Sequence, residues 1–117
     1  MGDPVMQFQI LSNVPDETSN FYSSLFGWNV SANNPLGYRE ISTGSKNGIQ
    51  GGIWPAPQQA RNFVQLFIAV ENVRASVKRA EELGAKLIIP PTGLPDGGEL
   101  AVMRDPQGIA FGIIKKL

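Results

Sequence analysis

Few side chains in this sequence could act as catalytic groups or metal ligands. The residue types that are missing exclude several kinds of active site. The 117 residues include no histidine and no cysteine. Imidazole is the commonest transition-metal ligand and the usual general base near neutral pH, and thiols supply disulfides, metal sites and nucleophiles. The remaining candidates for acid–base work are two carboxylates, Glu40 in "GYREIST" and Glu99 in "GGELAVMR". Either could act as a general base if its strand buries it, although a surface carboxylate is the simpler interpretation of both.

Glutamines and glycines form the second group of candidates, because they recur at related places. "FQILSNV" aligns with "LFIAVENV", which pairs Gln7 with Gln65, and "NGIQGGIW" aligns with "QGIAFGII", which pairs Gly52 with Gly112. A glycine inside a strand weakens it and packs nothing, so these two glycines need a reason. The alternative to a duplication is coincidence between short apolar strands, but the order of elements repeats as well.

The first half of the chain reads as strand, helix and three further strands. Residues 5–11 alternate polar and apolar side chains, which is typical of a strand. An amphipathic helix of about three turns follows, with Asn13 as a candidate cap and Gly27 as its end. We expect strands at the segments that come next, which are 28–32, 38–43 and 48–54.

The second half repeats this order. Residues 62–70 predict a strand, and 71–84 predict a helix that ends at Gly84. Three more strands are expected at 85–90, 98–104 and 108–114. Each half therefore reads β-α-β-β-β.

Composition favours one domain over residues 1–117, because a hydrophobic fraction of 42% supports one ordinary core. Ten basic side chains balance ten acidic ones. No basic stripe forms, which argues against nucleic acid as a partner. "MGDPVMQFQI" has neither a basic n-region nor a long apolar stretch, so we expect no signal peptide, no membrane partner and a cytoplasmic location.

The order of these motifs resembles the vicinal-oxygen-chelate superfamily, which contains glyoxalases, bleomycin-resistance proteins and extradiol dioxygenases. The motifs that carry the resemblance are "FYSSLFGW", "GGIW", "VENVRASVKRAEELGAKLI" and "VMRDPQGIAFGII". The resemblance implies an α+β fold in which two tandem βαβββ modules, about 5–56 and 62–116, form a half-open curled sheet around a pocket. It also implies a homodimer that completes the pocket between chains.

Enzymes of the superfamily hold a divalent metal with residues, usually His and Glu, on the first and last strands of each module. Carried over position by position, these places fall on Gln7, Gly52, Gln65 and Gly112. A glutamine carbonyl is a weak neutral donor, and glycine offers no side chain. We therefore expect no metal site and no cofactor.

Strand alternation predicts which side chains face the pocket. If Gln7 points inward, Phe8 and Ile10 pack on the helix, and Gly52 and Gly112 leave open space. The predicted ligand-binding residues are Gln7, Gln9, Gln50, Gly52, Trp54, Gln65, Phe67 and Gly112. A pocket lined by amides and aromatic rings suits a planar organic molecule with a few hydrogen-bonding groups. Alternatively, the glutamines face solvent and the glycines relieve crowding at a bend.

The leading interpretation is a metal-independent binding protein, similar in type to bleomycin-resistance proteins, that sequesters a small planar compound or drug. One alternative is a glyoxalase-related lyase or dioxygenase-like enzyme with an atypical metal site, or with Glu40 or Glu99 as base. Another is an interaction module that holds no small molecule. The sequence leaves open whether the chain is an enzyme.

Overall fold

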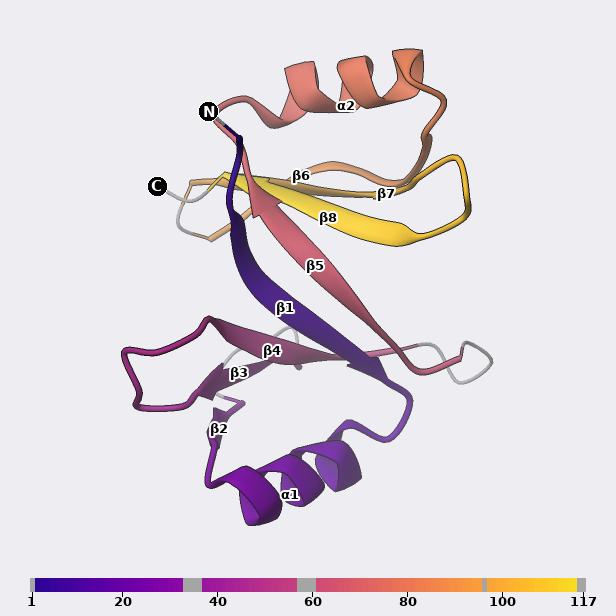
Figure 1. The fold of residues 1–117 in the computed structure, drawn as a ribbon. Helices are drawn as coiled ribbons and strands as arrows, with labels where there is room; N and C mark the ends of the chain where they lie inside the picture. Colours follow the sequence, from indigo (N-terminus) through magenta and orange to yellow (C-terminus); the bar gives the residue numbers. More distant parts are fainter. Residues whose placement is uncertain (1, 33–36, 57–60, 96, 116–117) are drawn as a thin grey trace. The chain divides into compact units, whose positions relative to one another are not determined.

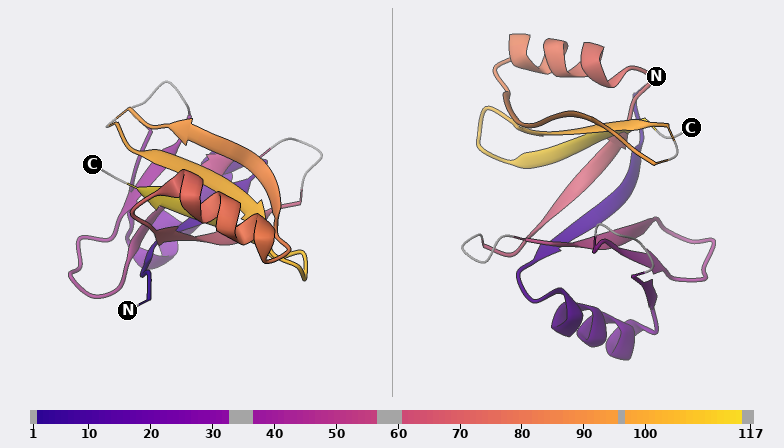
Figure 2. Two further views of the ribbon diagram at one scale, coloured as in Figure 1. Left: turned by 90° about the horizontal axis from the view of Figure 1, so that it is seen from above. Right: turned by 180° about the vertical axis from the view of Figure 1, so that it is seen from behind.

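The computed structural model describes residues 2–32, 37–56, 61–95 and 97–115, and they group into two units (Figures 1 and 2). The first unit is Gln7–Gln65, and the second is Met1–Met6 with Leu66–Leu117. Between the strands expected at 28–32 and 38–43, residues 33–36 lie outside the described residues.

The first unit has the predicted order of one strand, one helix and three strands. Its elements are β1 (Val5–Ser12), α1 (Pro15–Phe26), β2 (Asn29–Ser31), β3 (Arg39–Ser42) and β4 (Gln50–Pro55). β1 pairs in parallel with β4, while β4 with β3 and β3 with β2 are antiparallel. α1 covers one face of this sheet (Figure 1).

The second unit repeats the arrangement. Its elements are β5 (Phe63–Ala69), α2 (Val73–Glu82), β6 (Lys86–Gly93), β7 (Glu99–Arg104) and β8 (Ala110–Lys115). β5 pairs in parallel with β8, while β8 with β7 and β7 with β6 are antiparallel. The first residues of β5, up to Gln65, are grouped with the first unit.

Strand register supports the duplication at the level of single residues. Gln9 on β1 lies opposite Gly52 on β4, and Phe67 on β5 lies opposite Gly112 on β8. The sequence alignment makes Gln9 equivalent to Phe67 and Gly52 equivalent to Gly112, so the two parallel pairings match. The α+β class and the two tandem βαβββ modules are confirmed.

Local sequence explains where both helices begin and end. Pro15 occupies the start of α1, and Gly27 ends it in a left-handed conformation with φ 72°. The expected cap at Asn13 is wrong, because Val14 occupies the N-cap position of α1 and makes no side-chain cap hydrogen bond. α2 is capped by Asn72, whose side chain accepts the Ala75 amide at 3.0 Å. Neither helix among the described residues is long and apolar enough to cross a membrane.

The helix-facing side of the first sheet is as predicted. The rings of Phe8 and Trp28 lie 5.7 Å apart, and Ser12 and Thr18 of α1 share a hydrogen bond of 2.6 Å. Ile10 lines a cavity together with Phe21 of α1. Since side chains alternate along a strand, Gln7 and Gln9 point to the opposite face.

The second unit has apolar clusters on both faces of its sheet. Val73 and Val77 of α2 pack with Ala101, Met103 and Ile113. The other face carries a separate cluster of Phe67, Val102 and Ile114, with Leu94 and Leu100 at its edge. The face equivalent to that of Gln9 is therefore a closed core in this unit.

Candidate ligand-binding site

The register of the first unit gathers several predicted site residues on the sheet face that points away from α1. Gln9, Gly52 and Glu40 lie side by side across β1, β4 and β3. Gln7 and Gln50 form the neighbouring pair on the same face. We call this surface the glutamine face, defined by Gln7, Gln9, Tyr38, Glu40, Gln50, Gly52, Trp54 and Gln65.

Tyr38 is the residue of this face that the sequence analysis missed. Its ring lies over Gly52, where a Cβ atom would overlap the phenol, and its centroid is 4.5 Å from that of Trp54. Alternation could have found it, because Tyr38 stands two residues before Glu40 and therefore shares its face. The open space expected beside Gly52 is not there, and this part of the prediction is wrong.

A small hydrogen-bond network fixes the Tyr38 phenol. Tyr38 Oη accepts from Gln9 Nε2 at 3.3 Å and donates to the Gly51 carbonyl at 3.3 Å. Burial raises the pKa of Tyr38 above its usual value. The hydrogen bond from Gln9 partly offsets this increase in the pKa, and the negative charge of Glu40 adds to it.

Two buried glutamines leave one atom each without a partner. Gln9 is 2% exposed and Gln65 is 5% exposed. Within the part of the chain that the structure describes, neither Oε1 atom has a hydrogen-bond partner. Buried polar atoms are rarely left in this state, so both carbonyl oxygens call for an explanation.

Gln50 differs from these two, because its amide is used within the fold. Its Oε1 accepts the Thr43 amide at 2.7 Å, and its Nε2 donates to Thr43 Oγ1 at 3.1 Å. Gln50 therefore holds the end of β3 against β4. The structure gives it no free hydrogen-bonding role comparable to that of Gln9.

Phe67 and Gly112, the remaining predicted residues, lie in the second unit. A Cβ atom at position 112 would come within 2.5 Å of the Phe67 ring. Phe67 is 2% exposed and belongs to the apolar cluster with Val102 and Ile114. The open space expected beside Gly112 is also absent, because the ring of its neighbour on β5 fills it.

The residues present do not fit a divalent metal of the kind the superfamily uses. At both last-strand positions a glycine stands where a carboxylate would be needed, and an aromatic ring fills the space a side chain would take. The first-strand positions offer only neutral glutamine amides. Among the described residues no three or more of His, Cys, Asp and Glu gather in a way that could hold a metal ion.

Neither candidate general base is buried. Glu99 faces α2, on the opposite side of its sheet from Gly112, and its Oε2 lies 3.0 Å from Arg74 Nη2. Glu40 lies on the glutamine face but is exposed. The burial that a general base at either position would require is therefore absent.

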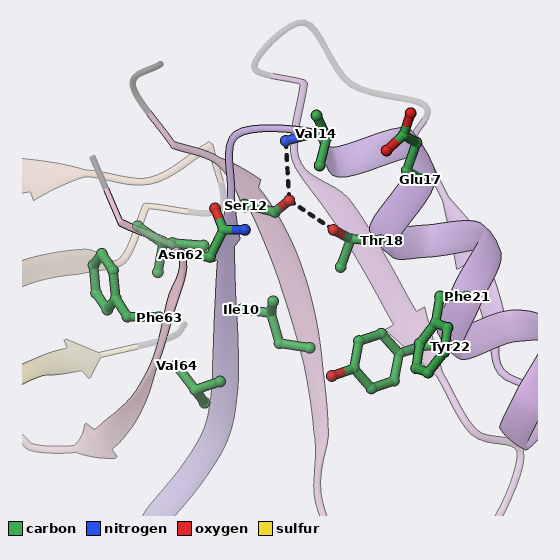
Figure 3. A pocket seen from close by; sticks show the side chains of 11 residues that line it. Ile10, Ser12, Val14, Glu17, Thr18, Phe21, Tyr22, Asn62, Phe63 and Val64 are labelled. Carbon is green, nitrogen blue, oxygen red and sulfur yellow. Dashed lines mark hydrogen bonds between the residues drawn. The ribbon is translucent and has the colours of Figure 1, made fainter. Parts of the chain in front are cut away.

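A separate cavity of about 410 Å³ lies on the helix side of the first sheet (Figure 3). Two of its polar side chains are already engaged, since the Ser12 hydroxyl bonds both the Val14 amide and the Thr18 hydroxyl. The cavity is lined by Ile10, Leu11, Ser12, Val14, Glu17, Thr18, Phe21, Tyr22, Asn62, Phe63 and Val64. None of the predicted ligand-binding residues is among them. This cavity was not predicted, because alternation indicates that Ile10 packs toward the helix but does not indicate whether space remains between them.

Comparison with known proteins identifies the family. A model of the glyoxalase-like domain matches residues 7–114, so the chain belongs to the glyoxalase-like domain family, within the vicinal-oxygen-chelate superfamily. The "Putative glyoxylase CFP32" of Mycobacterium bovis is 27% identical over 110 residues, which are 92% of this chain and 42% of that protein. The chain therefore spans less than half the length of this relative.

Solved structures with the same fold cover nearly the whole chain. A protein of Bacillus halodurans, BH1468, has a TM-score of 0.73 at 11% identity over 100% of this chain and 96% of its own. Streptomyces coelicolor methylmalonyl-CoA epimerase, solved with 2-nitronate-propionyl-CoA, has a TM-score of 0.63 at 14% identity over 97% of both chains. At these identities the likeness concerns the fold alone.

Proposed function

We propose that this chain binds a small planar organic molecule on the glutamine face without using a metal. The molecule is held and not transformed, so the role is sequestration. A homodimer and a cytoplasmic location are part of the same proposal.

The observation that carries the proposal is the position of Tyr38 over Gly52. A metal-dependent member of the superfamily needs a carboxylate at this place, whereas here a phenol fills the space from a neighbouring strand. Phe67 repeats the replacement over Gly112 in the other module. The same loss in both modules supports a protein whose function does not depend on the metal.

The aromatic pair on this face supports a planar ligand. The rings of Tyr38 and Trp54 lie 4.5 Å apart with an interplanar angle of 33°. Aromatic surfaces bind planar molecules through offset or tilted stacking, and nearby polar groups orient the ligand. Two relatives are also named for small-molecule chemistry, one as a glyoxylase and one as an epimerase of a CoA ester.

Tryptophan fluorescence offers a direct test, because the chain has two tryptophans in different settings. Trp54 lies on the glutamine face, whereas Trp28 stacks on Tyr22 at 5.2 Å on the helix side. A Trp28→Phe variant reports ligand binding from Trp54 alone, and Trp54→Phe is its matched control. We expect aromatic amides and heterocycles to quench the first variant with saturation and to leave the second unchanged.

The alternative to sequestration is a metal-dependent enzyme, as the name of the mycobacterial relative, a glyoxylase, suggests. Protein made without a histidine tag is incubated with Ni²⁺, Zn²⁺, Mn²⁺ or Fe²⁺, dialysed, and analysed for bound metal. We expect far less than one ion per chain. Stoichiometric metal together with turnover of a glyoxalase substrate would replace sequestration by the enzymatic alternative.

A further inference from the structure

We infer that Gln9 and Gln65 form a pair of hydrogen-bond acceptors that selects planar aromatic ligands carrying N–H donors. This inference rests on the proposed function and specifies the ligand class of the same face. The inference depends on which atoms of the two side-chain amides already have hydrogen-bond partners in the fold and which atoms do not.

The Tyr38 network fixes the orientation of the Gln9 amide. A phenol has one proton, and that of Tyr38 goes to the Gly51 carbonyl. Tyr38 Oη must then accept from Gln9, so Gln9 presents Nε2 to it and turns Oε1 away. The atom left over is therefore an acceptor, in a side chain that is 2% exposed.

Gln65 supplies a second acceptor in the first unit. Alternation places it on the same side of β5 as Phe67, on the sheet face that points away from α2, just as Gln9 lies on the face of its own sheet that points away from α1. Gln65 is 5% exposed, and its Oε1 also has no hydrogen-bond partner among the described residues.

The two glutamines lie on strands that neighbour each other in the sheet. The Asn13 amide donates to the Asn62 side chain at 3.0 Å, which joins the end of β1 to the start of β5. The two strands run in opposite directions from this contact, so Gln9 and Gln65 come at similar distances along them. One ligand group with two N–H bonds could satisfy both oxygens.

The charges around these acceptors favour a neutral or cationic donor. Glu40, the carboxylate of the glutamine face, lies beside Gly52 and raises the pKa of Tyr38 through its charge. Arg39, the adjacent cation, faces the other way and pairs with Asp16 of α1 at 2.8 Å. An anionic ligand would therefore meet two carbonyl oxygens and a carboxylate. A carboxamide or an amidine on an aromatic ring meets complementary groups.

Three ligands with one ring system test this selection. 2-Naphthamide carries N–H donors, methyl 2-naphthoate keeps the carbonyl but has no donor, and 2-naphthoate is an anion. Binding is measured by Trp54 quenching in the Trp28→Phe protein. We expect the amide to bind about tenfold more tightly than the ester, as one or two buried hydrogen bonds provide, and the anion to bind most weakly.

Substitution of Gln65 tests whether this residue causes the preference for the amide over the ester. Gln65→Met keeps the length of the side chain but removes the acceptor, so the amide should lose about tenfold in affinity while the ester changes little. Gln107→Met, at an exposed turn residue of the second unit, is the matched control and should alter neither ligand. Thermal unfolding of each variant confirms that it is folded at the assay temperature.

The outcomes separate this inference from the proposed function. If the ester or the anion binds as tightly as the amide, or if Gln65→Met weakens amide and ester equally, the acceptor role is overturned while ligand binding stands. If none of the three ligands quenches Trp54 up to its solubility limit, the proposed binding of planar molecules is overturned with it.

Discussion

The phenol of Tyr38 lies over Gly52, in the space that a side chain at position 52 would need. The ring of Phe67 has the same relation to Gly112 in the second unit. The surroundings of the two rings differ. Tyr38 belongs to a half-buried polar network, whereas Phe67 belongs to an apolar cluster.

Gly112→Ala should destabilise the protein through this contact. The added methyl group meets the Phe67 ring, which is 2% exposed and packed by Val102 and Ile114, so it has little room to move. We expect a loss of about 1–3 kcal/mol in the free energy of unfolding, as for other overpacked cores, measured by urea denaturation. Gly93→Ala is the control, because nothing lies within 4 Å of its Cβ position. Equal effects of the two changes would contradict the packing argument.

Gly52→Ala should act on the titration of Tyr38. The methyl group overlaps the phenol and displaces it. Loss of burial, which is the largest cause of the raised pKa, should bring the pKa of Tyr38 back toward its usual value and outweigh the loss of the Gln9 hydrogen bond, which lowers this pKa. Absorbance titration in a Tyr22→Phe background reports Tyr38 alone, since the chain has two tyrosines. Glu40→Gln should also lower the Tyr38 pKa, by removing a negative charge. A Tyr38 pKa unchanged by both substitutions would contradict the described network.

The raised pKa of Tyr38 also predicts how stability depends on pH. The folded state keeps the phenol proton to a higher pH than the unfolded chain, whose tyrosines ionise near pH 10. This stabilisation is complete below the unfolded pKa and is lost as the pH rises from there through the folded pKa. Tyr38→Phe should therefore flatten the alkaline decline in thermal stability, whereas Tyr22→Phe serves as the comparison. An equally steep decline in both variants would argue against the effect.

Ser12→Ala should weaken the entry to α1. The Ser12 hydroxyl, 1% exposed, accepts the Val14 amide and bonds Thr18, so its removal leaves two groups without their partner. We expect a loss of about 1–2 kcal/mol in the free energy of unfolding. Ser24→Ala, an exposed position of the same helix, should change it by less than about 0.5 kcal/mol. A Ser12→Ala, Thr18→Val double-mutant cycle should reveal coupling between these two side chains.

Glu99→Gln should leave both ligand binding and stability nearly unchanged. Glu99 pairs with Arg74, whose side chain is 72% exposed, and such surface pairs contribute about 0–1 kcal/mol. We expect at most a small fall in the melting temperature, and high salt concentration should abolish the difference from the unmodified protein because salt screens the ion pair. A large loss of ligand affinity in this variant would restore the role that the sequence suggested for Glu99.

The fold could be predicted from the sequence because its signals are local and repeated. Alternation around Gln7 and Gln9, the glycine at position 27 and the echo of Gly52 in Gly112 fixed the order of elements and the facing of β1. The site was harder to predict, because the space beside a glycine depends on what a neighbouring strand inserts there. Phe67 reaches Gly112 from β5, which is distant in sequence, and Tyr38 reaches Gly52 from the start of the neighbouring strand β3. Alternation predicts the face of Tyr38, but it does not predict that the ring lies over Gly52.

The same long-range effect explains why similar glutamines differ in role. Gln9 and Gln50 both lie on the predicted face, but Thr43 satisfies the amide of Gln50 and only half of the Gln9 amide is satisfied. The residue type predicts a hydrogen-bonding group. Only the assembled sheet determines which of its atoms stays free.

The rings over Gly52 and Gly112 also have an evolutionary consequence. A carboxylate introduced at either glycine would collide with an aromatic side chain, and removal of the ring first would leave a cavity or break the Gln9 network. A single substitution at position 52 or 112 would therefore not supply a usable carboxylate, because a second change at Tyr38 or Phe67 would have to make room for it first.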